Sequence, residues 1–261
     1  MRPRSISAVN RLDLEEKTEI YTRFLPSPLL ERFNIPPTFV DPNGNHLLKL
    51  RCEPGTADVV IELKHAYTAV DPVLFAHLMD TVNGQIHVLL YIVNDPTSKR
   101  YDVDRMPDGT KTQFGIFKRN LQAEEAAMRA GLAPGQVRKG LRILKHSILA
   151  FEDFVSSLGH DLFFAEPLYY HNAISFERYG FAYLKGRRLM ERINQGFQEG
   201  QEFHLLLDGR SPFRSSEMAK SIRGRSWAIH DGVLGQSYDH VTMYKSIGRY
   251  AGINTFPNGL W

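Results

Sequence analysis

Hydrophobic and polar positions follow two different periods along the chain, and the period changes near residue 119. Before that point the apolar residues come in short runs that are typical of strands. Residues 46–52 (HLLKLRC) and 57–65 (ADVVIELKH) predict a hairpin, because the turn-forming sequence EPGT separates them. Residues 84–94 (GQIHVLLYIVN) are nearly continuously apolar and lie between Asn-Gly and Asn-Asp-Pro, which makes them the strongest predicted strand.

Proline and glycine positions predict the remaining elements of this first half. Residues 13–33 have a helical pattern that Pro-Ser-Pro at 26–28 interrupts. Asp71-Pro72 predicts the start of a short helix through Met79, since proline is tolerated in the first turn of a helix. Residues 106–110 (MPDGT) predict the tip of a hairpin.

From residue 119 onward the apolar spacing becomes helical. Residues 119–131 predict a helix that ends at Gly131, and a longer helix is predicted from about Gly135 to Leu158. Its apolar stripe has the three-and-four spacing of an amphipathic helix. The stripe contains Val137, Leu141, Leu144, Ile148, Phe151, Val155 and Leu158.

The last hundred residues contain shorter predicted elements. Residues 162–168 (LFFAEPL) predict a buried strand, and residues 186–197 predict a helix. Residues 203–209 (FHLLLDG) predict a strand or a short buried helix. We therefore expect an arm at 1–45, a core at 46–200 and a C-terminal extension packed on the core at 201–261.

Composition narrows the class of protein without identifying a function. The chain has 261 residues, 43% of them hydrophobic and 23% charged, as in an ordinary globular protein. A single cysteine suits a reducing compartment. The N-terminus has no apolar segment behind its basic residues, and the longest apolar run, 88–93, is far below the ~20 residues of a membrane span. The sequence thus predicts a cytoplasmic protein without a membrane partner, and the net charge of +3 fits small anions as well as nucleic acid.

Residues 175–181 read Ser-Phe-Glu-Arg-Tyr-Gly-Phe, which predicts a helix end followed by a glycine turn. Gly180 can adopt a positive φ there, and Phe181 then buries its ring as the chain turns into a strand. Together with the preceding helix and strand, this corner resembles the C-terminal half of the Gcn5-related N-acetyltransferase (GNAT) fold over roughly residues 134–185. The resemblance implies an α/β fold with a mixed, mostly antiparallel central sheet flanked by helices, here followed by a helical C-terminal extension.

The resemblance also implies a cofactor site. In that family a basic, glycine-bearing turn starts a helix whose amides hold the pyrophosphate of acetyl-CoA, and the next strand diverges to admit the pantetheine arm. Here that strand would be residues 162–168. Arg142 stands where the family normally has glycine or alanine. The pyrophosphate role would fall on Gln136, Val137, Arg138, Lys139, Gly140, Leu141 and Arg142.

The predicted chemistry centres on the residues that follow the apolar strand. Glu166 is the predicted general base, because desolvation on a buried strand would make its carboxylate more basic. Tyr170 or His171 would manage the leaving thiolate, since Phe176 stands where the family often has tyrosine. Tyr169 and Asn172 are predicted to contact the substrate from a loop, although the same cluster also fits an aromatic lid over the core.

This resemblance implies an acyl-CoA-dependent N-acyltransferase that transfers an acyl group from acetyl-CoA or another acyl-CoA to a small-molecule or peptide amine, with no metal. A homodimer remains an open expectation. One alternative is a nucleic-acid-binding helix-turn-helix over residues 119–146. Another is a catalytically inactive GNAT-like protein that binds a ligand.

Overall fold

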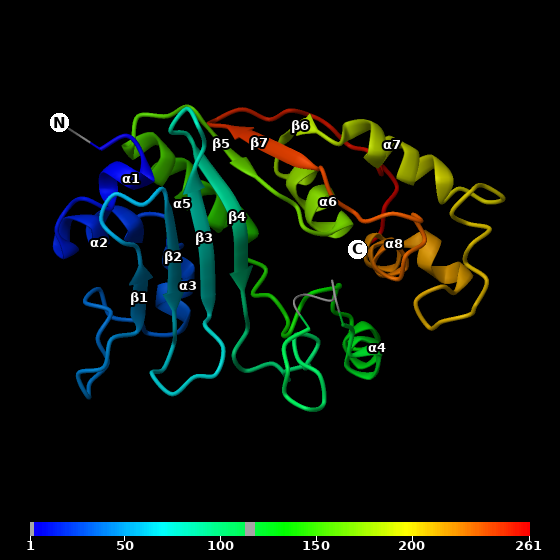
Figure 1. The fold of residues 1–261 in the computed structure, drawn as a ribbon, viewed down its shortest axis with the longest axis horizontal. Coiled ribbons are helices and arrows are strands. Elements are labelled where there is room, and N and C mark those ends of the chain that lie inside the picture. Colours follow the sequence, from blue (N-terminus) through cyan, green and yellow to red (C-terminus); the bar gives the residue numbers. More distant parts are fainter. Residues whose placement is uncertain (1–2, 113–117) are drawn as a thin grey trace. The chain divides into compact units, whose positions relative to one another are not determined.

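The computed structural model describes residues 3–112 and 118–261. Contacts divide the chain into two compact units, which are described separately below (Figure 1). Each unit combines stretches that are distant in the sequence, whereas the predicted division at residues 45 and 200 is sequential. Unit 1 comprises Met1–Thr97, Gly140–Glu166 and Tyr244–Tyr250, and unit 2 comprises Ser98–Lys139, Pro167–Met243 and Ala251–Trp261.

Unit 1 begins its sheet with an antiparallel meander of β1 (Leu48–Arg51), β2 (Asp58–Leu63), β3 (Leu74–Asp80) and β4 (Ile86–Val93). The predicted hairpin of β1 and β2 and the predicted strand at 84–94 are therefore confirmed. In β2 the buried side chains alternate with more exposed ones, which is the period of a strand with one face on the core.

The helix predicted at residues 71–79 is wrong, because this segment forms β3. Leu74, Ala76 and Leu78 are completely buried, while Phe75 and His77 between them are half-exposed. This alternation has period two, and both neighbouring strands pair with it. Tertiary pairing thus prevails over the local helix-start signal of Asp71-Pro72.

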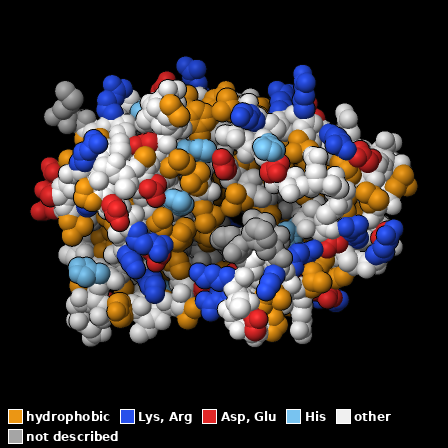
Figure 2. Space-filling model, viewed as in Figure 1, with side chains coloured by type: hydrophobic (Ala, Val, Ile, Leu, Met, Phe, Trp, Pro, Cys, Tyr) orange, Lys and Arg blue, Asp and Glu red, His pale blue; other side chains and the backbone are white. Residues whose placement is uncertain are grey.

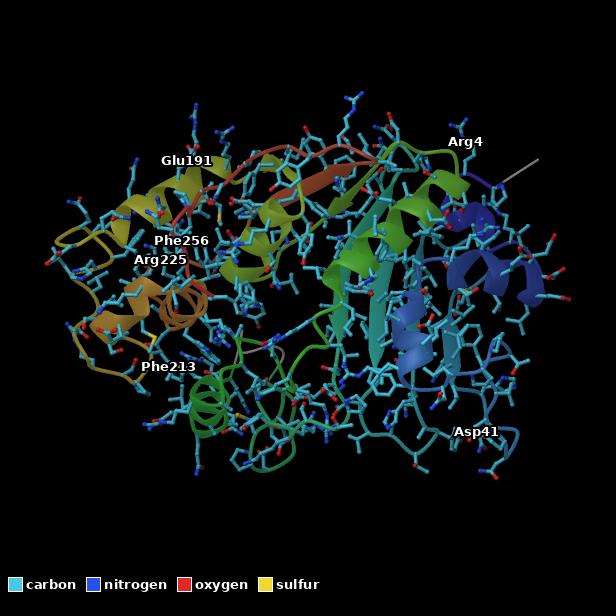
Figure 3. All side chains as sticks on the ribbon, turned by 180° about the vertical axis from the view of Figure 1, so that it is seen from behind. Arg4, Asp41, Glu191, Phe213, Arg225 and Phe256 are labelled. Carbon is cyan, nitrogen blue, oxygen red and sulfur yellow. The ribbon has the colours of Figure 1, made fainter. Side chains whose placement is uncertain are left out.

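Helices cover one face of this sheet in unit 1 (Figure 3). Phe24 stacks on Phe151 with ring centroids 5.0 Å apart, and Phe151 stacks in turn on Phe163. The opposite face carries half-exposed side chains, among them His77 and His87, and Figure 2 shows hydrophobic and histidine side chains there. The covering helices are α1 (Ile6–Val9), α2 (Leu14–Thr22), α3 (Ser27–Arg32) and α5 (Leu144–Ser157).

The long helix predicted from Gly135 begins nine residues later, at Leu144 of α5. Gly135 has φ 78° and Arg142 has φ 59°, and neither value is compatible with a continuous right-handed helix. Ile148 and Val155 of the predicted stripe are buried as expected. The amphipathic period was correct, but the helix start was wrong.

Three further strands, β5, β7 and β6, complete the sheet. β5 (Leu162–Ala165) pairs with β4 in parallel, and β7 (Thr242–Ser246) passes from unit 2 into unit 1 at Tyr244. The last strand is β6 (Ala182–Lys185), and among the described residues hydrogen bonds link the strands in the order β1-β2-β3-β4-β5-β7-β6. The fold is therefore α/β with a mixed, mostly antiparallel sheet, as predicted.

Unit 2 is mainly helical, and its helices α6 and α8 pack against each other. The corner predicted at Gly180 is confirmed, because Gly180 has φ 81° and Phe181, 1% exposed, stacks on Phe176 at 4.8 Å. Residues 203–209 form turns, so neither predicted element is present there. The elements are α4 (Leu121–Arg129), α6 (Tyr170–Arg178), β6 (Ala182–Lys185), α7 (Arg187–Gly196), a 3₁₀ helix (Ser216–Lys220) and α8 (Ile222–His230).

Helix length also bears on the membrane expectation. Of the helices in the described residues, none is long and apolar enough to cross a membrane.

Candidate functional site: a fork between two parallel strands

In unit 1, strands β4 and β5 pair over a short distance and then separate. Their parallel register contains His87 opposite Phe164 and Val88 opposite Ala165. The amide of Glu166 then donates a hydrogen bond of 3.2 Å to the carbonyl of Val88. Within the part of the chain that the structure describes, β4 continues to Val93 without further pairing to β5. We call this place the fork.

A β-bulge in β4 explains why the strands part here. Leu78 of β3 lies opposite Val88 and His77 lies opposite Leu90, so that Leu89 is an extra residue in β4. A bulge bends its strand and increases the local twist, which directs the second half of β4 away from its former neighbour. Alternating burial ends at the same point, since the residues from Leu89 onward are half-buried on both faces.

Among the described residues, the second half of β4 has one edge that does not pair with β5. The amide of Asn94 donates to Val73 O before β3 at 3.0 Å, so the amides of Tyr91 and Val93 point toward the opposite edge by the alternation of a strand. Gly140 approaches this edge closely, because a Cβ added to it would lie 3.6 Å from Val93 O. The edge of β4 that does not pair with β5 thus runs from the fork to Val93, where the chain at Gly140 lies close to it.

The start of α5 lies in the same unit and has no side-chain cap. Ile143 is its N-cap residue and makes no side-chain cap hydrogen bond in the described structure, and the first turn contains no acidic residue. The first amides of a helix lack intrahelical acceptors and carry the positive end of the helix dipole. The helix-start amides of this segment are therefore those of Leu144, Lys145 and His146, rather than those of Gln136–Arg142.

The residues predicted to hold a pyrophosphate lie in a loop before α5, so the prediction that they form the first turn of a helix is wrong. Arg138 Nη1 donates to Ser98 O, and the amide of Lys139 donates to Ser98 Oγ at 3.1 Å. Gln136 Oε1 accepts from the amide of Ala133 at 2.7 Å. Without helical geometry these amides do not share the common direction that an anion site at a helix start requires.

The predicted pyrophosphate set also contains Val137, Gly140, Leu141 and Arg142. Val137 packs against the apolar cluster of Val103 in unit 2, and Leu141 is buried in unit 1 at 7% exposure. Gly140 and Arg142 are exposed. Of the predicted set, Gly140, Leu141 and Arg142 therefore belong to the unit that contains the fork.

Glu166 lies directly at the fork, but not in the buried environment predicted for it. Its side chain is 42% exposed, so the expected desolvation is absent. His87 Nε2 lies 3.5 Å from Glu166 Oε1, and it is buried without a formed hydrogen bond among the described residues. Burial lowers the pKa of His87, and the carboxylate of Glu166 opposes this to a smaller extent. His87 is consequently a neutral imidazole near neutral pH that faces a partly exposed carboxylate.

Sequence reasoning did not select His87 as a site residue. With His77, it is one of two histidines on the described β strands, and only the pairing register places it opposite Phe164 beside Glu166. The useful signal was the break in alternation after Val88, which marks the bulge.

The predicted substrate-contact and proton-donor residues lie in unit 2. They form the N-cap and first turn of α6 rather than a loop, and they are Tyr169, Tyr170, His171 and Asn172. Tyr170 is 1% and His171 is 4% exposed. Burial raises the pKa of Tyr170 to about 12 and lowers the pKa of His171 to about 3. Both side chains are therefore neutral at pH 7 and inaccessible, which corrects the expectation of an exposed proton donor.

The remaining two members of this cluster have structural contacts. Asn172 Oδ1 accepts from the amide of Tyr169 at 3.2 Å. Tyr169 stacks on His171 with ring centroids 5.7 Å apart, and burial raises the pKa of Tyr169 to about 12. The alternative of an aromatic cover over the core of unit 2 agrees with these contacts.

Unit 2 also contains a buried ion network that the sequence did not reveal. Arg119 donates to Glu124 Oε2 at 2.9 and 2.6 Å and to Asp231 Oδ1 at 2.8 Å. His230 Nε2 lies 3.1 Å from Glu124 Oε1, and Arg214 Nε donates to Asp231 Oδ2 at 2.8 Å. The pair His230-Asp231 is visible in the sequence, but its partners are 17 to 112 positions away.

The hydrogen bonds of this network determine the charge of its two acids. Burial alone would raise the pKa of the Glu124 carboxyl. The hydrogen bonds from His230 and Arg119 have the larger combined effect, so the pKa lies below its ordinary value. Burial would likewise raise the pKa of the Asp231 carboxyl, but hydrogen bonds from Arg119, Ser211 and Arg214 together lower it below its ordinary value. Both carboxylates are ionised and paired, which is the chemistry of a structural clamp.

The two other expectations concern metals and helix-turn-helix geometry. Residues 3–112 and 118–261 contain no group of three or more His, Cys, Asp or Glu side chains arranged to hold a metal ion. α4 is formed as predicted, but the second helix of the motif over residues 119–146 is missing between Gly131 and Ile143.

Comparison of the chain with family models, with curated proteins and with solved structures gave no match.

Proposed function

We propose that the chain is a GNAT-like, acyl-CoA-dependent N-acyltransferase that acts on a small-molecule or peptide amine. The observation that supports this function best is the fork, where β4 and β5 pair in parallel over two positions and then separate beside Glu166 and His87. The resemblance at residues 134–185 implies such a divergence of strands, and the Gly180 corner agrees with it.

The edge of β4 that does not pair with β5 fits an extended carrier arm. Val88 and Val93 are five residues apart, which corresponds to about 17 Å along a strand. The amides and carbonyls of this edge would be the hydrogen-bond partners for the amide groups of a pantetheine arm. The half-buried apolar side chains from Leu89 onward would contact its methylene groups.

The start of α5 would hold the anionic end of acyl-CoA. The uncapped amides of Leu144, Lys145 and His146 provide donors, and the exposed Lys145 adds a positive charge. A cation is unfavourable beside the positive end of a helix, and a bound pyrophosphate would remove that cost. When bound, acyl-CoA supplies the activated acyl thioester.

Glu166 and His87 would receive the proton of the attacking amine. The carboxylate of Glu166 is partly exposed to solvent, and His87 is neutral near pH 7 because burial lowers its pKa. The pair can therefore accept one proton and share it across 3.5 Å without leaving an unpaired charge at the fork. Because Tyr170 and His171 are buried in unit 2, neither is assigned a step.

Calorimetric titration of the protein with acetyl-CoA and with CoA tests the binding part of this function. We expect saturable binding, and Lys145→Glu should weaken it about tenfold, equivalent to about 1.4 kcal/mol. The matched control is Lys185→Glu, which makes the same charge change at an exposed position of unit 2 and should leave the affinity unchanged. Absence of heat with either ligand, together with absence of a thermal shift, would remove the proposed function.

An acyl-transfer assay with a panel of amines tests the chemistry separately. Transfer from acetyl-CoA or from longer acyl-CoAs supports the enzyme. Saturable CoA binding without transfer to any amine would instead favour the inactive, ligand-binding alternative.

A further inference from the structure

Arg225 of α8 is a buried cation in unit 2 that has no acidic partner in the described part of the chain. Its side chain is 3% exposed. Its guanidinium lies 3.5 Å from the centroid of the Phe256 ring and 5.2 Å from that of Phe197 (Figure 3). Aromatic faces stabilise a cation only partly, and a buried charge normally has a counter-charge.

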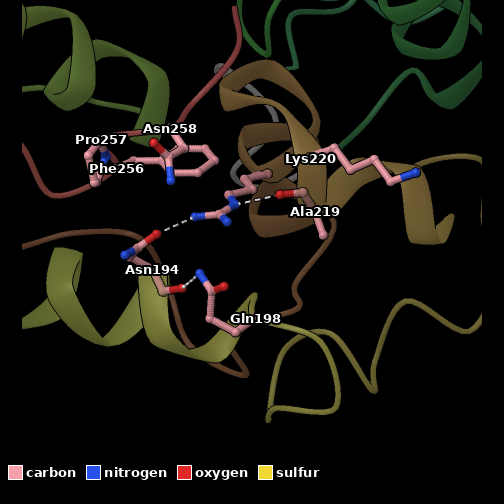
Figure 4. A pocket seen from close by; sticks show the side chains of 8 residues that line it. Asn194, Gln198, Ala219, Lys220, Phe256, Pro257 and Asn258 are labelled. Atoms are coloured by element: carbon pink, nitrogen blue, oxygen red, sulfur yellow. Dashed lines mark hydrogen bonds between the residues drawn. The ribbon is translucent and has the colours of Figure 1, made fainter.

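The neutral partners of Arg225 leave part of its guanidinium available. Nε donates to Ala219 O at 2.8 Å, and Nη1 donates to Asn194 Oδ1 at 2.9 Å, as the dashed lines in Figure 4 show. The buried hydroxyl of Tyr170 has no hydrogen-bond partner among the described residues. A guanidinium has five N–H donors, so three remain beyond these two hydrogen bonds.

Arg225 lines a pocket of about 170 Å³ in unit 2 (Figure 4). This volume is similar to the ~150 Å³ of a cavity that admits a benzene-sized molecule. The lining supplies the amide side chains of Asn194, Gln198 and Asn258, and Lys220 adds a second cation. Lys220 is exposed and paired with Glu217 at 2.6 Å, so Arg225 is the buried charge of the site.

The other arginines of unit 2 make this site unusual. Arg119 and Arg214 are also partly buried, and both bind the carboxylate of Asp231. Arg225 has amide, carbonyl and aromatic partners instead, and it lines a pocket. We propose that this pocket binds a small oxyanion, a carboxylate or a phosphate group, whose oxygens pair with Arg225.

Such a ligand would be recognised edge-on. Phe256 covers one face of the guanidinium, so only its edge can meet two oxygens in the bidentate geometry that arginine favours. The surrounding amide side chains can donate to the remaining oxygens. The binding site is distinct from the fork of unit 1 and does not depend on acyl-CoA.

The test measures thermal unfolding and calorimetric binding of the full chain with sodium malonate, sodium phosphate or sodium chloride at equal ionic strength. We expect malonate, phosphate or both to raise the melting temperature by about 3 °C or more over chloride at saturation. A response to malonate alone identifies a carboxylate site, and a response to phosphate alone identifies a phosphate site. Equal melting temperatures in all three salts would overturn the proposal.

Asn194→Asp provides the decisive variant, because it places a carboxylate where Asn194 Oδ1 already lies 2.9 Å from Arg225 Nη1. We expect this internal anion to raise the melting temperature in chloride and to abolish the response to malonate and phosphate. Asn172→Asp makes the same charge change outside the pocket and should keep the full response. A full response in Asn194→Asp would contradict the assignment.

A second variant addresses the site without changing a buried residue. Lys220→Glu adds a negative charge at an exposed lining position and should weaken oxyanion binding about tenfold while secondary structure is retained. Unchanged affinity in this variant would also count against the pocket.

Discussion

The fork of unit 1 and the ion network of unit 2 use the same side-chain types in opposite ways. In the network, Glu124 is 3% exposed and receives two hydrogen bonds from Arg119, with His230 at 3.1 Å. At the fork, Glu166 is 42% exposed and its nearest histidine nitrogen is 3.5 Å away. Both places contain a glutamate and a histidine, yet only one of them is saturated with partners.

This difference is the one expected between a structural role and the chemical role that we propose for the fork. A buried carboxylate with several donors is held ionised and has no capacity to exchange protons near neutral pH. A partly exposed carboxylate beside a neutral imidazole retains that capacity, and it lies next to the edge of β4 that does not pair with β5. Perturbed pKa values alone would have selected the network, whereas geometry and exposure select the fork.

Breaking the network should produce the largest change in stability. Arg119→Met keeps much of the volume but leaves Glu124 and Asp231 without their shared cation, and loss of one partner of a buried ion pair costs about 3–5 kcal/mol. Urea unfolding followed by circular dichroism would measure this. A loss below about 1 kcal/mol would show that the network is not buried in solution.

At the fork, the corresponding change should affect catalysis and leave stability intact. Glu166→Gln removes the proton acceptor but preserves the shape, so we expect acyl transfer to fall about a hundredfold while CoA affinity stays constant. Because the side chain is partly exposed, the urea midpoint should hardly move. A fall in stability without a fall in transfer would reverse the roles assigned to the two places.

Because His171 of unit 2 is buried, we expect the free energy of unfolding to depend on pH. Its pKa in the folded state is lowered to about 3 from an ordinary 6.5, chiefly by burial, so the unfolded chain binds the proton first as the pH falls. The stability that the neutral His171 contributes is fully present above pH 6.5. Below pH 6.5 the free energy of unfolding falls by about 1.4 kcal/mol per pH unit. His171→Asn should reduce the slope of unfolding free energy between pH 6.5 and 5 by about one proton. An unchanged slope would assign that dependence to other histidines.

The smallest effect is expected for an exposed ion pair of the same chemistry as the network. Arg129 contacts Glu125 at 2.6 Å, but its side chain is 73% exposed. Arg129→Met should therefore change stability by less than about 0.5 kcal/mol, as for other exposed helix pairs. In the same urea assay, a loss approaching that of Arg119→Met would mean that burial does not set the difference between the two pairs.

The sequence predicted those parts of the fold that depend on local periodicity. The hairpin of β1 and β2, the strand β4 and the corner at Gly180 are confirmed, because turn residues and apolar spacing specify them over a few positions. β3 was predicted as a helix because Asp71-Pro72 is a strong local signal, while its pairing with two neighbouring strands is not visible locally.

The candidate site was predicted less well for a related physical reason. Glu166 was selected, but its burial was wrong, since Ala165 ends the strand one residue earlier. The helix start was misplaced because apolar spacing continues through Val137 and Leu141, whereas Arg142 adopts a positive φ that ends any helix before it. His87 was missed because its proximity to Glu166 depends on the register of a parallel pair.

The central claim is that the separated edge of β4 and the uncapped start of α5 bind an acyl carrier. A crystal structure of the protein soaked with CoA tests this claim most directly. We predict density for the pantetheine arm along Tyr91 and Val93, with the diphosphate within hydrogen-bonding distance of the amides of Leu144, Lys145 and His146. A structure in which protein side chains fill the fork, or in which CoA binds elsewhere on the chain, would contradict it.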